Sequence, residues 1–296
     1  MAEFTIPDDI LSNIKDQVIL ITGGSSGIGR TTAELCANLG AKVVIGDLKP
    51  PLIDPPSDPL HTNIKFVPVD VTSWQSLRLL FDETDKLYGG IDHVFANAGV
   101  APTTDFLNLH PLTPEQLEPP DLRTIQVNLT ALLYTVHLST AYMKSLASRR
   151  PLRPTGSIVL AGSATSYQTF RAGDYTIAKH GVLGMIRGMT VQLEAEGSIR
   201  LNAVTPSWTE TGIIPTMGAL REMGVQVQAP EVVARSVVLL FADEKRHGEV
   251  IYSWAGRYKE VNKAGGGLLS VVKRLNFDGD HPNEDMQALW EQMTNS

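Results

Sequence analysis

The sequence predicts an α/β protein: a doubly wound parallel sheet of about seven strands, folded as a single domain with a C-terminal extension. Short apolar runs alternate with longer segments of helical spacing along residues 15–255. The first apolar run stops at a Gly-rich turn that opens a helical segment. The chain has 296 residues and is 43% hydrophobic, which suits one large core. We therefore expect residues 1–255 to form the domain and residues 256–296 the extension.

The first unit is a strand, a Gly-rich turn and a helix. The apolar run stops at Thr22, helical spacing begins at Gly29, and Gly40 ends it. A second β-rich run, KVVIGD, follows at once, so the unit is a βαβ with a right-handed crossover. A later amphipathic segment starts at the N-cap candidate Ser73 and stops at Gly89. The expected strands are 18–21, 42–47, 64–69, 93–96, 157–160, 201–204 and 249–253.

Two segments break this alternation. The stretch PPLIDPPSDPL after Asp47 carries too many prolines to be a helix, so we expect an extended surface loop. Beyond Ser253 the chain continues through a triple glycine and a short amphipathic piece. A terminal helix is expected from about Pro282. No internal repeat or second domain is indicated.

Charge and composition exclude several classes of function. Twenty-five basic and thirty-two acidic side chains leave a net charge of -7, which offers no general attraction to nucleic acid or anionic lipid. The single cysteine, Cys36, lies in an apolar helical stretch and fits a reducing compartment. The N-terminus has no apolar run of signal-peptide length, and no window is long enough to cross a bilayer. The histidines lack metal-site spacing. We expect a cytoplasmic protein without metal, nucleic acid or membrane partners.

The turn TGGSSGIG is a candidate phosphate-binding site. Gly23, Gly27 and Gly29 lie between a strand and a helix, where absent side chains let the backbone approach a pyrophosphate. The alternative is an ordinary tight turn. Asp47 ends the second strand, and a carboxylate there can bind both ribose hydroxyls of an adenosine and repel a 2′-phosphate. This favours NAD(H) over NADP(H), although nearby Arg30 and Lys49 do not exclude NADP(H), and Asp47 could be a solvated loop residue.

Tyr175 and Lys179 lie one helical turn apart in RAGDYTIAKH. Hydride transfer at a carbinol carbon needs a group that moves the hydroxyl proton. A phenol with a pKa near 10 is a poor base, but an ammonium one turn away, helped by the positive charge of an oxidised nicotinamide, should lower that pKa. The spacing alone is also met by a tyrosine that packs in a core, so the choice depends on the rest of the chain.

The chain resembles the short-chain dehydrogenase/reductase family over roughly residues 15–255, with a Rossmann-like fold implied. The resemblance rests on TGGSSGIG, Asp70-Val71, ANAG, QVNLT, LAGSA, the Tyr175/Lys179 pair and LNAVTPSWTET, in this order. The Pro-rich loop and the tail look similar to fungal secondary-metabolism members.

This resemblance implies an NAD(H)-dependent oxidoreductase acting on a secondary alcohol or its ketone. Tyr175 is the acid/base, Ser163 holds the substrate oxygen, and Asn128 anchors a water that links Lys179 to solvent. The implied catalytic residues are Asn128, Ser163, Tyr175 and Lys179. The implied cofactor residues are Gly23, Ser25, Ser26, Gly27, Ile28, Gly29, Asp47, Asp70, Val71, Asn97, Ala98, Gly99, Tyr175, Lys179, Pro206 and Thr211.

The resemblance also implies partners. Family members pair through the two long helices, here about 122–147 and 174–196, so a homodimer or homotetramer is implied. The segment after the sixth strand covers the substrate in this family, and Trp208, Met217 and Met223 would make it an apolar lid here, unless they are packing residues. This favours a bulky, weakly polar small-molecule substrate.

Three departures from the family pattern leave alternatives open. Ala96 stands before Asn97 where a second Asn is usual, and Ser207 replaces a common glycine. Ser163 precedes Tyr175 by one residue fewer than usual, so Ser166 or Thr165 could take its role.

Two other functions also fit: a catalytically silent NAD(H)-binding sensor or scaffold, and a pocket that steers a non-redox or coupled cyclisation.

Overall fold

The computed structural model describes residues 3–51, 63–103, 115, 118–149, 156–196, 199–213, 217–275 and 293. The expected Pro-rich loop falls largely outside these residues, as does the expected terminal helix apart from Met293. A short helix, α9 (Leu268–Leu275), forms where the amphipathic piece after the triple glycine was expected.

The described residues form a nine-stranded sheet with the order β1-β9-β8-β7-β6-β5-β2-β3-β4. Seven neighbouring strands, β2 to β8, are parallel and confirm the predicted doubly wound sheet. The other two, β1 and β9, extend one edge through antiparallel pairs and were not predicted. The strands are β1 (Glu3–Phe4), β2 (Val18–Thr22), β3 (Lys42–Asp47), β4 (Ile64–Pro68), β5 (His93–Ala96), β6 (Ser157–Ala161), β7 (Arg200–Pro206), β8 (Val250–Trp254) and β9 (Arg257–Glu260).

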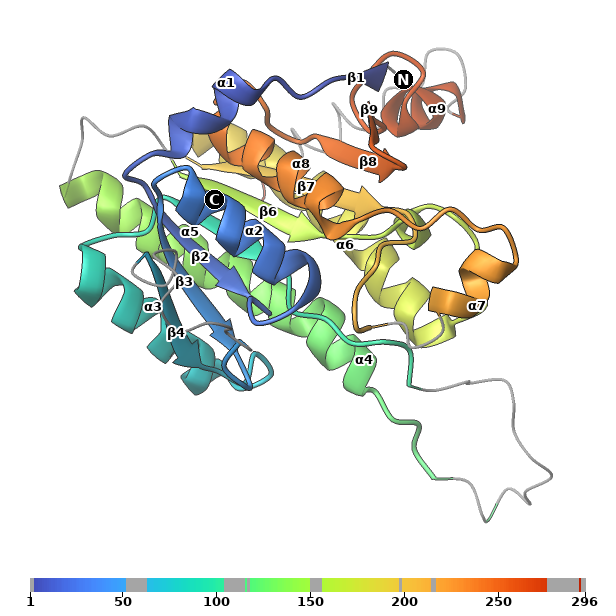
Figure 1. The fold of residues 1–296 in the computed structure, drawn as a ribbon, viewed down its shortest axis with the longest axis horizontal. Helices are drawn as coiled ribbons and strands as arrows, with labels where there is room; N and C mark the ends of the chain where they lie inside the picture. The colour runs from blue at the N-terminus through green and yellow to red at the C-terminus, as the bar shows by residue number, and fades with distance from the viewer. Residues whose placement is uncertain are drawn as a thin grey trace.

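Helices cover both faces of this sheet (Figure 1). On one face α2 packs against α8, and α1 against α8; on the other, α3 packs against α5 and α4 against α6. The helical elements are α1 (Asp8–Leu11), η1 (Ser12–Ile14), α2 (Gly27–Asn38), α3 (Trp74–Tyr88), α4 (Arg123–Ile125), η4 (Gln126–Thr130), α5 (Ala131–Arg149), η5 (Ala164–Ser166), α6 (Gly173–Glu196), α7 (Met217–Glu222) and α8 (Pro230–Ala242).

Two apolar cores result, one on each side of the sheet. Ile19 and Ile21 of β2 point to one core, whereas Leu20, between them, points to the other. All three side chains are fully buried. A strand covered on both faces is apolar at successive positions, which is why VILIT reads as a continuous run.

The signals predicted for α3 are present. The Ser73 side chain accepts a hydrogen bond from the Ser76 amide at 3.3 Å, so Ser73 is the N-cap. Gly89 ends the helix in the left-handed conformation, with φ 72°.

The strand order reverses between β2 and β5. From β2 the chain proceeds to β3 and β4 on one side, and from β5 to β8 on the other. Loops that leave the carboxyl ends of β2 and β5 therefore diverge and leave a crevice between them, which is where ligands bind in sheets of this kind.

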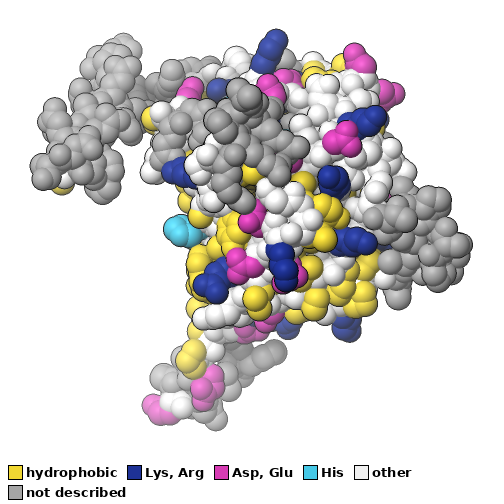
Figure 2. Space-filling view, turned by 90° about the vertical axis from the view of Figure 1, so that its left-hand side faces the viewer, with side chains coloured by type: hydrophobic (Ala, Val, Ile, Leu, Met, Phe, Trp, Pro, Cys, Tyr) yellow, Lys and Arg dark blue, Asp and Glu magenta, His cyan; other side chains and the backbone are white. Residues whose placement is uncertain are grey.

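Charged groups of both signs mix on the molecular surface shown in Figure 2, where basic and acidic side chains are interspersed among apolar ones. Among the described residues, no helix combines the length and apolar character that a membrane span requires. The same residues hold no cluster of three or more histidine, cysteine or acidic side chains suited to a metal ion.

Candidate active site

The Gly-rich turn between β2 and α2 is packed too closely for side chains. A Cβ at Gly29 would lie 2.1 Å from the carbonyl oxygen of Gly23, and a Cβ at Gly23 would lie 2.7 Å from Cα of Ala98. Gly23 and Gly27 also have φ of 67° and 51°. The turn thus presents bare backbone at the start of α2, where free amides and the helix dipole favour an anion.

The segment after β5 holds this turn in place. The Asn97 side chain donates hydrogen bonds to the carbonyl oxygens of Thr22 at 3.2 Å and Gly23 at 2.9 Å. The Thr22 hydroxyl accepts from the amides of Asn97 and Ala98 at 3.1 and 3.3 Å. The asparagine of the ANAG motif is therefore bonded to the backbone of the Gly-rich turn. The substitution at Ala96 leaves these bonds intact.

A cavity of about 560 Å³ opens at this crevice. Its walls are formed by the Gly-rich turn, the ends of β3 and β5, the helical turns α4 and η4 before α5, and the segment after β7. The predicted cofactor residues that line it are Gly23, Ser26, Gly27, Ile28, Asp47, Asp70, Val71, Asn97, Ala98, Gly99 and Thr211. Its volume and position suit a dinucleotide. Ser25, Gly29, Tyr175, Lys179 and Pro206 are not among its lining residues.

Thr211 reaches this cavity from a distant part of the chain. Its side chain lies 3.1 Å from the position of a Cβ at Gly27. The segment after β7 therefore closes over the start of α2.

The Asp47 carboxylate is fixed at the end of β3. It accepts hydrogen bonds from the amides of Ser25 at 3.1 Å and Leu48 at 2.7 Å. Nearby Arg30 is paired with Glu34, with 2.7 Å between Nε and Oε1. The carboxylate of Asp47 therefore lies at this end of the cavity, whereas the guanidinium of Arg30 is directed along α2 to Glu34.

Asp70 begins the segment after β4. Its carboxylate accepts hydrogen bonds from the amide and the hydroxyl of Thr72 at 2.9 and 2.7 Å. These bonds fold the backbone into a tight turn, and the neighbouring Val71 side chain is buried against the cavity.

Ser163, Tyr175 and Lys179 meet at the end of β6. A hydrogen bond joins the side chains of Ser163 and Tyr175. Lys179 Nζ lies 5.6 Å from the centroid of the Tyr175 ring and donates to the carbonyl oxygen of Ala161 at 2.7 Å. Lys179 is buried, with 4% of its side chain exposed. The acid/base pair expected from the sequence is therefore part of one cluster.

Burial dominates the electrostatics of this cluster. It raises the pKa of Tyr175, and the hydrogen bond to Ser163 lowers that pKa by less. It also lowers the pKa of Lys179 to about 8. The sequence-based expectation was that Lys179 lowers the pKa of Tyr175. For the protein groups alone the pKa of Tyr175 is raised instead, because desolvation disfavours the charged form of each residue. The effect of an oxidised nicotinamide on that pKa stays a prediction.

A tight turn places Ser163 beside Tyr175 despite the short spacing. The Ser163 hydroxyl accepts from the Thr165 amide, and the Ser166 hydroxyl accepts from the Ser163 amide, both at 3.2 Å. Ser166 is almost fully buried and bonded within this capping box. Thr165 has a buried hydroxyl without a partner in the described part of the chain. Of the three candidates, Ser163 is the one bonded to Tyr175.

Asn128 lies within a π-helical turn, η4, that the sequence did not predict. Its side chain is fully buried and bonds both backbone groups of Val100: it accepts from the amide at 2.8 Å and donates to the carbonyl at 2.9 Å. A π turn contains one residue more than an α-helical turn and so shifts the side chains that follow it around the helix axis; such turns recur at functional sites. Here the turn ties the helix to the segment after β5.

Sequence reasoning missed part of the cavity wall. Arg123, Gln126 and Val127 line it from the helix just before Asn128. Gln126 and Val127 are themselves part of QVNLT, and Arg123 lies three residues before it, so the motif was the available signal. The segment that carried the predicted apolar lid is described in part: Trp208 and Met223 lie within it, and Met223 is exposed.

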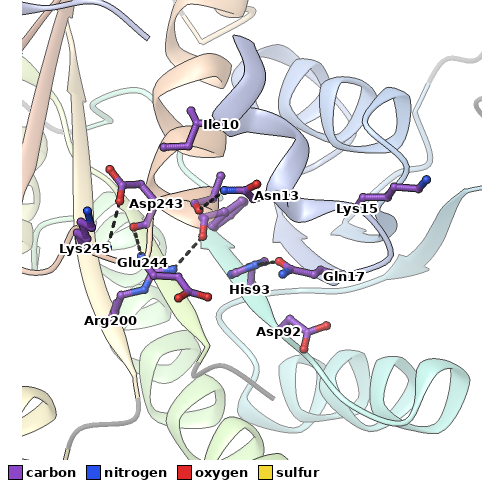
Figure 3. A pocket seen from close by; sticks show the side chains of 12 residues that line it. Ile10, Asn13, Lys15, Gln17, Asp92, His93, Arg200, Asp243, Glu244 and Lys245 are labelled. Atoms are coloured by element: carbon purple, nitrogen blue, oxygen red, sulfur yellow. Dashed lines mark hydrogen bonds between the residues drawn. The ribbon is translucent and has the colours of Figure 1, made fainter. Parts of the chain in front are cut away.

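A second cavity, of about 780 Å³, lies at the amino ends of the strands, opposite the carboxyl ends that form the first cavity (Figure 3). Two of its polar side chains, Arg200 and His93, bond within the fold. Arg200 donates to the carbonyl oxygens of Leu240 and Phe241, both at 2.8 Å, and so caps α8. His93 bonds Ser157 at 2.8 Å. The larger cavity is therefore not the better candidate site.

Known proteins give an independent comparison. A family model described as short chain dehydrogenase matches residues 17–219. A short-chain dehydrogenase/reductase of Acremonium egyptiacum, ascJ, is 43% identical over 265 residues, which cover 89% of this chain and 87% of that protein. The (-)-isopiperitenol/(-)-carveol dehydrogenase of Mentha piperita is 32% identical over 79% of this chain and 89% of its own.

The fold is shared with solved structures as well. A short-chain type dehydrogenase/reductase from Mycobacterium marinum superposes with a TM-score of 0.70 at 22% identity, covering 83% of this chain and 97% of that one. One relative is fungal, as the resemblance implied. The match to the family model and the identity to these relatives show that the chain belongs to the short-chain dehydrogenase/reductase family.

Proposed function

We propose that the chain is an NAD(H)-dependent oxidoreductase that transfers hydride between nicotinamide and a bulky, weakly polar secondary alcohol or ketone. The family consists of oxidoreductases that use nicotinamide cofactors, and its members generally act on CH–OH groups. The observation that carries the proposal is the cluster at the end of β6, where the hydroxyl of Tyr175 is bonded to Ser163 beside Lys179.

The glycine cradle supports a dinucleotide. Its backbone leaves no room for side chains, and the side chain of the N-cap residue Ser26 makes no capping bond to the amides of α2. Those amides would hold the pyrophosphate. The predicted contacts of Ser25, Pro206 and Lys179 with the cofactor belong to this proposal.

Asp47 supports NAD(H) as the preferred cofactor. Its carboxylate can accept hydrogen bonds from ribose hydroxyls, and it would repel a 2′-phosphate. Arg30 is already paired with Glu34, which reduces its ability to bind that phosphate. The 2′-phosphate of NADP(H) would therefore be repelled by Asp47, and Arg30 would be less able to bind it.

The residues of the cluster have distinct roles in this reaction. Bound nicotinamide would give or take the hydride. Tyr175 moves the proton at the substrate oxygen, and Ser163 orients that oxygen through its hydroxyl. Lys179, whose Nζ lies 5.6 Å from the centroid of the Tyr175 ring, would stabilise charge that develops on the phenol oxygen. Asn128 would hold a water on the proton route to solvent, with its side chain already bonded to Val100.

The assembly we propose is a homodimer or homotetramer. The helices α5 and α6, through which family members pair, expose apolar side chains: Leu133 is 37% exposed, Ile177 59% and Val191 51%. We place the protein in the cytoplasm, with a small-molecule substrate and a role in fungal secondary metabolism.

The test combines binding with turnover. NADH and NADPH affinities are measured by fluorescence, and a panel of hydrophobic ketones and secondary alcohols is assayed with wild type and Tyr175→Phe. We expect tighter NADH binding and a loss of at least 100-fold in kcat for the variant, with cofactor affinity retained. Tyr134→Phe, which removes a hydroxyl on α5 away from the cluster, is the control.

Other outcomes favour the two alternatives. Cofactor binding without turnover of any substrate would support a sensor or scaffold. Turnover that does not depend on Tyr175, without deuterium transfer from labelled cofactor, would support a non-redox or cyclising pocket.

A further inference from the structure

Two segments leave the sheet side by side next to Tyr175. The segment after β6 carries Ser163, and the segment after β7 follows Pro206. They are joined where the Gly162 amide donates to the carbonyl oxygen of Val204 at 2.8 Å. A Cβ at Gly162 would lie 2.8 Å from the Thr205 side chain. Side chains on the outer parts of both segments therefore face the same space above the sheet edge.

An aromatic pair connects these segments. The rings of Phe170 and Trp208 lie edge to face, with centroids 6.0 Å apart and planes at 68°. Phe170 is 43% exposed, and Trp208 is partly buried. Phe170 lies five residues before Tyr175, and Trp208 two residues after Pro206, so the exposed aromatic surface lies on the two segments that also carry candidate site residues.

The backbone fixes both members of the pair. The carbonyl oxygen of Phe170 accepts from the Thr176 hydroxyl at 3.2 Å, which attaches it to the first turn of α6. The carbonyl oxygen of Trp208 accepts from the Gln228 amide at 2.9 Å. The buried Gln228 side chain in turn donates to Thr209 and to Ser253 of β8, both hydroxyls at 3.1 Å. A preformed aromatic surface loses little entropy when a ligand binds.

Two charged groups of the adjoining segment pair with each other. Arg221 of α7 donates to Glu210 at 2.7 Å. Below the pair, Tyr167 contacts Tyr252 at 6.5 Å between centroids, and its hydroxyl bonds Thr205. Further aromatic side chains therefore lie beside the pair, and Arg171, which follows Phe170 in the chain, is exposed.

We propose that Phe170 and Trp208 bind the apolar ring of a cyclic, uncharged substrate and hold its carbonyl or carbinol carbon toward Tyr175. This inference rests on the proposed function and adds the substrate class: alicyclic or aromatic rings without a carboxylate or phosphate. Ring faces and edges complement each other, so a rigid ring gains more contact here than a flexible chain of equal carbon count.

The test measures selectivity. Wild type, Trp208→Ala and Phe170→Ala are assayed with NADH and two ketones of equal carbon count, cyclohexanone and 2-hexanone. We expect kcat/KM for cyclohexanone to fall at least tenfold more than for 2-hexanone in either variant. Trp208→Phe should restore most of the preference. Leu79→Ala, which trims a similarly exposed apolar side chain on α3, should leave the ratio unchanged. Equal losses for both ketones would overturn the inference.

Calorimetric binding separates this inference from the proposed function. Cyclohexanone and cyclohexanecarboxylate are titrated into the NADH complexes of wild type and Trp208→Ala. Binding of the ketone that weakens at least tenfold in the variant, without turnover of any ketone, would uphold the aromatic site and refute the redox function. Binding of neither compound, or preference for the carboxylate, would refute the aromatic site itself.

Discussion

Gly29→Ala tests the cofactor cradle most directly, because the clash it creates can be calculated. The new Cβ would lie 2.1 Å from the carbonyl oxygen of Gly23 and 2.5 Å from Nδ2 of Asn97. Ordinary contacts begin near 3.4 Å, so the Gly23 carbonyl must retreat by about 1.3 Å, the difference between 3.4 and 2.1 Å. That movement breaks the 2.9 Å hydrogen bond from Asn97.

The cost follows from these two events. Overpacking of a closely packed site costs about 1–3 kcal/mol, and a lost hydrogen bond about 1 kcal/mol. We expect unfolding free energy to fall by about 2–4 kcal/mol, which corresponds to a decrease in Tm of roughly 3–6 °C for a chain of this size. The displaced turn also carries the amides proposed to bind the pyrophosphate, so the Kd for NADH should rise at least ~tenfold.

The assay is thermal unfolding together with NADH fluorescence titration. Gly265→Ala is the matched control, since nothing lies within 4 Å of its Cβ and its φ is not positive. Alanine there should be neutral or stabilising by about 0.4–1 kcal/mol, with unchanged cofactor affinity. If Gly29→Ala retained the wild-type Tm and the wild-type Kd, the close approach of the turn and its role in binding would both be refuted.

Two further predictions concern charge. Asp47→Ser should raise the ratio of kcat/KM with NADPH to that with NADH at least ~tenfold, since a close charge repulsion in such a cavity is worth about 1–4 kcal/mol; an unchanged ratio would sink the ribose assignment. Burial lowers the pKa of Lys179 in the folded protein to about 8, against an ordinary value of 10.5. Between these two pH values the unfolded state binds more protons than the folded state, so the unfolding free energy of the wild type should rise with pH by on the order of 3 kcal/mol. Lys179→Met should lack this rise. Urea unfolding at pH 7.5 and 10 measures it, and the same change in unfolding free energy in both proteins would contradict the prediction.

Local patterns predicted the elements that surround the site. The run KVVIGD and the run beginning at His93 form β3 and β5 with the predicted bounds. Buried strands of a parallel sheet are apolar throughout, and the turns between them carry glycine, so both signals are local. The motif residues at the ends of these strands then come together because the carboxyl ends of parallel strands share one edge.

Features that depend on distant contacts were not predicted. Strand β1 has two residues, and β9 has the polar sequence RYKE; they form because Glu3 pairs with Arg257 at 2.6 Å and Phe4 stacks on Tyr258. Neither segment has a β pattern of its own. The π turn at Asn128 depends likewise on the bonds to Val100, which lies 28 residues earlier in the chain.

The pKa of Tyr175 bears on the direction of the proposed reaction. Sequence spacing places an ammonium beside the phenol and so predicts a phenolate, but the fold buries both groups and favours the neutral form of each. A neutral phenol bonded to Ser163 is the form that donates a proton, as reduction of a ketone requires. Oxidation of an alcohol requires the phenolate instead, so its rate should rise with pH toward the raised pKa of Tyr175, whereas ketone reduction should be fastest below it. If both directions had the same pH profile, a proton held on Tyr175 could not be the group that distinguishes them.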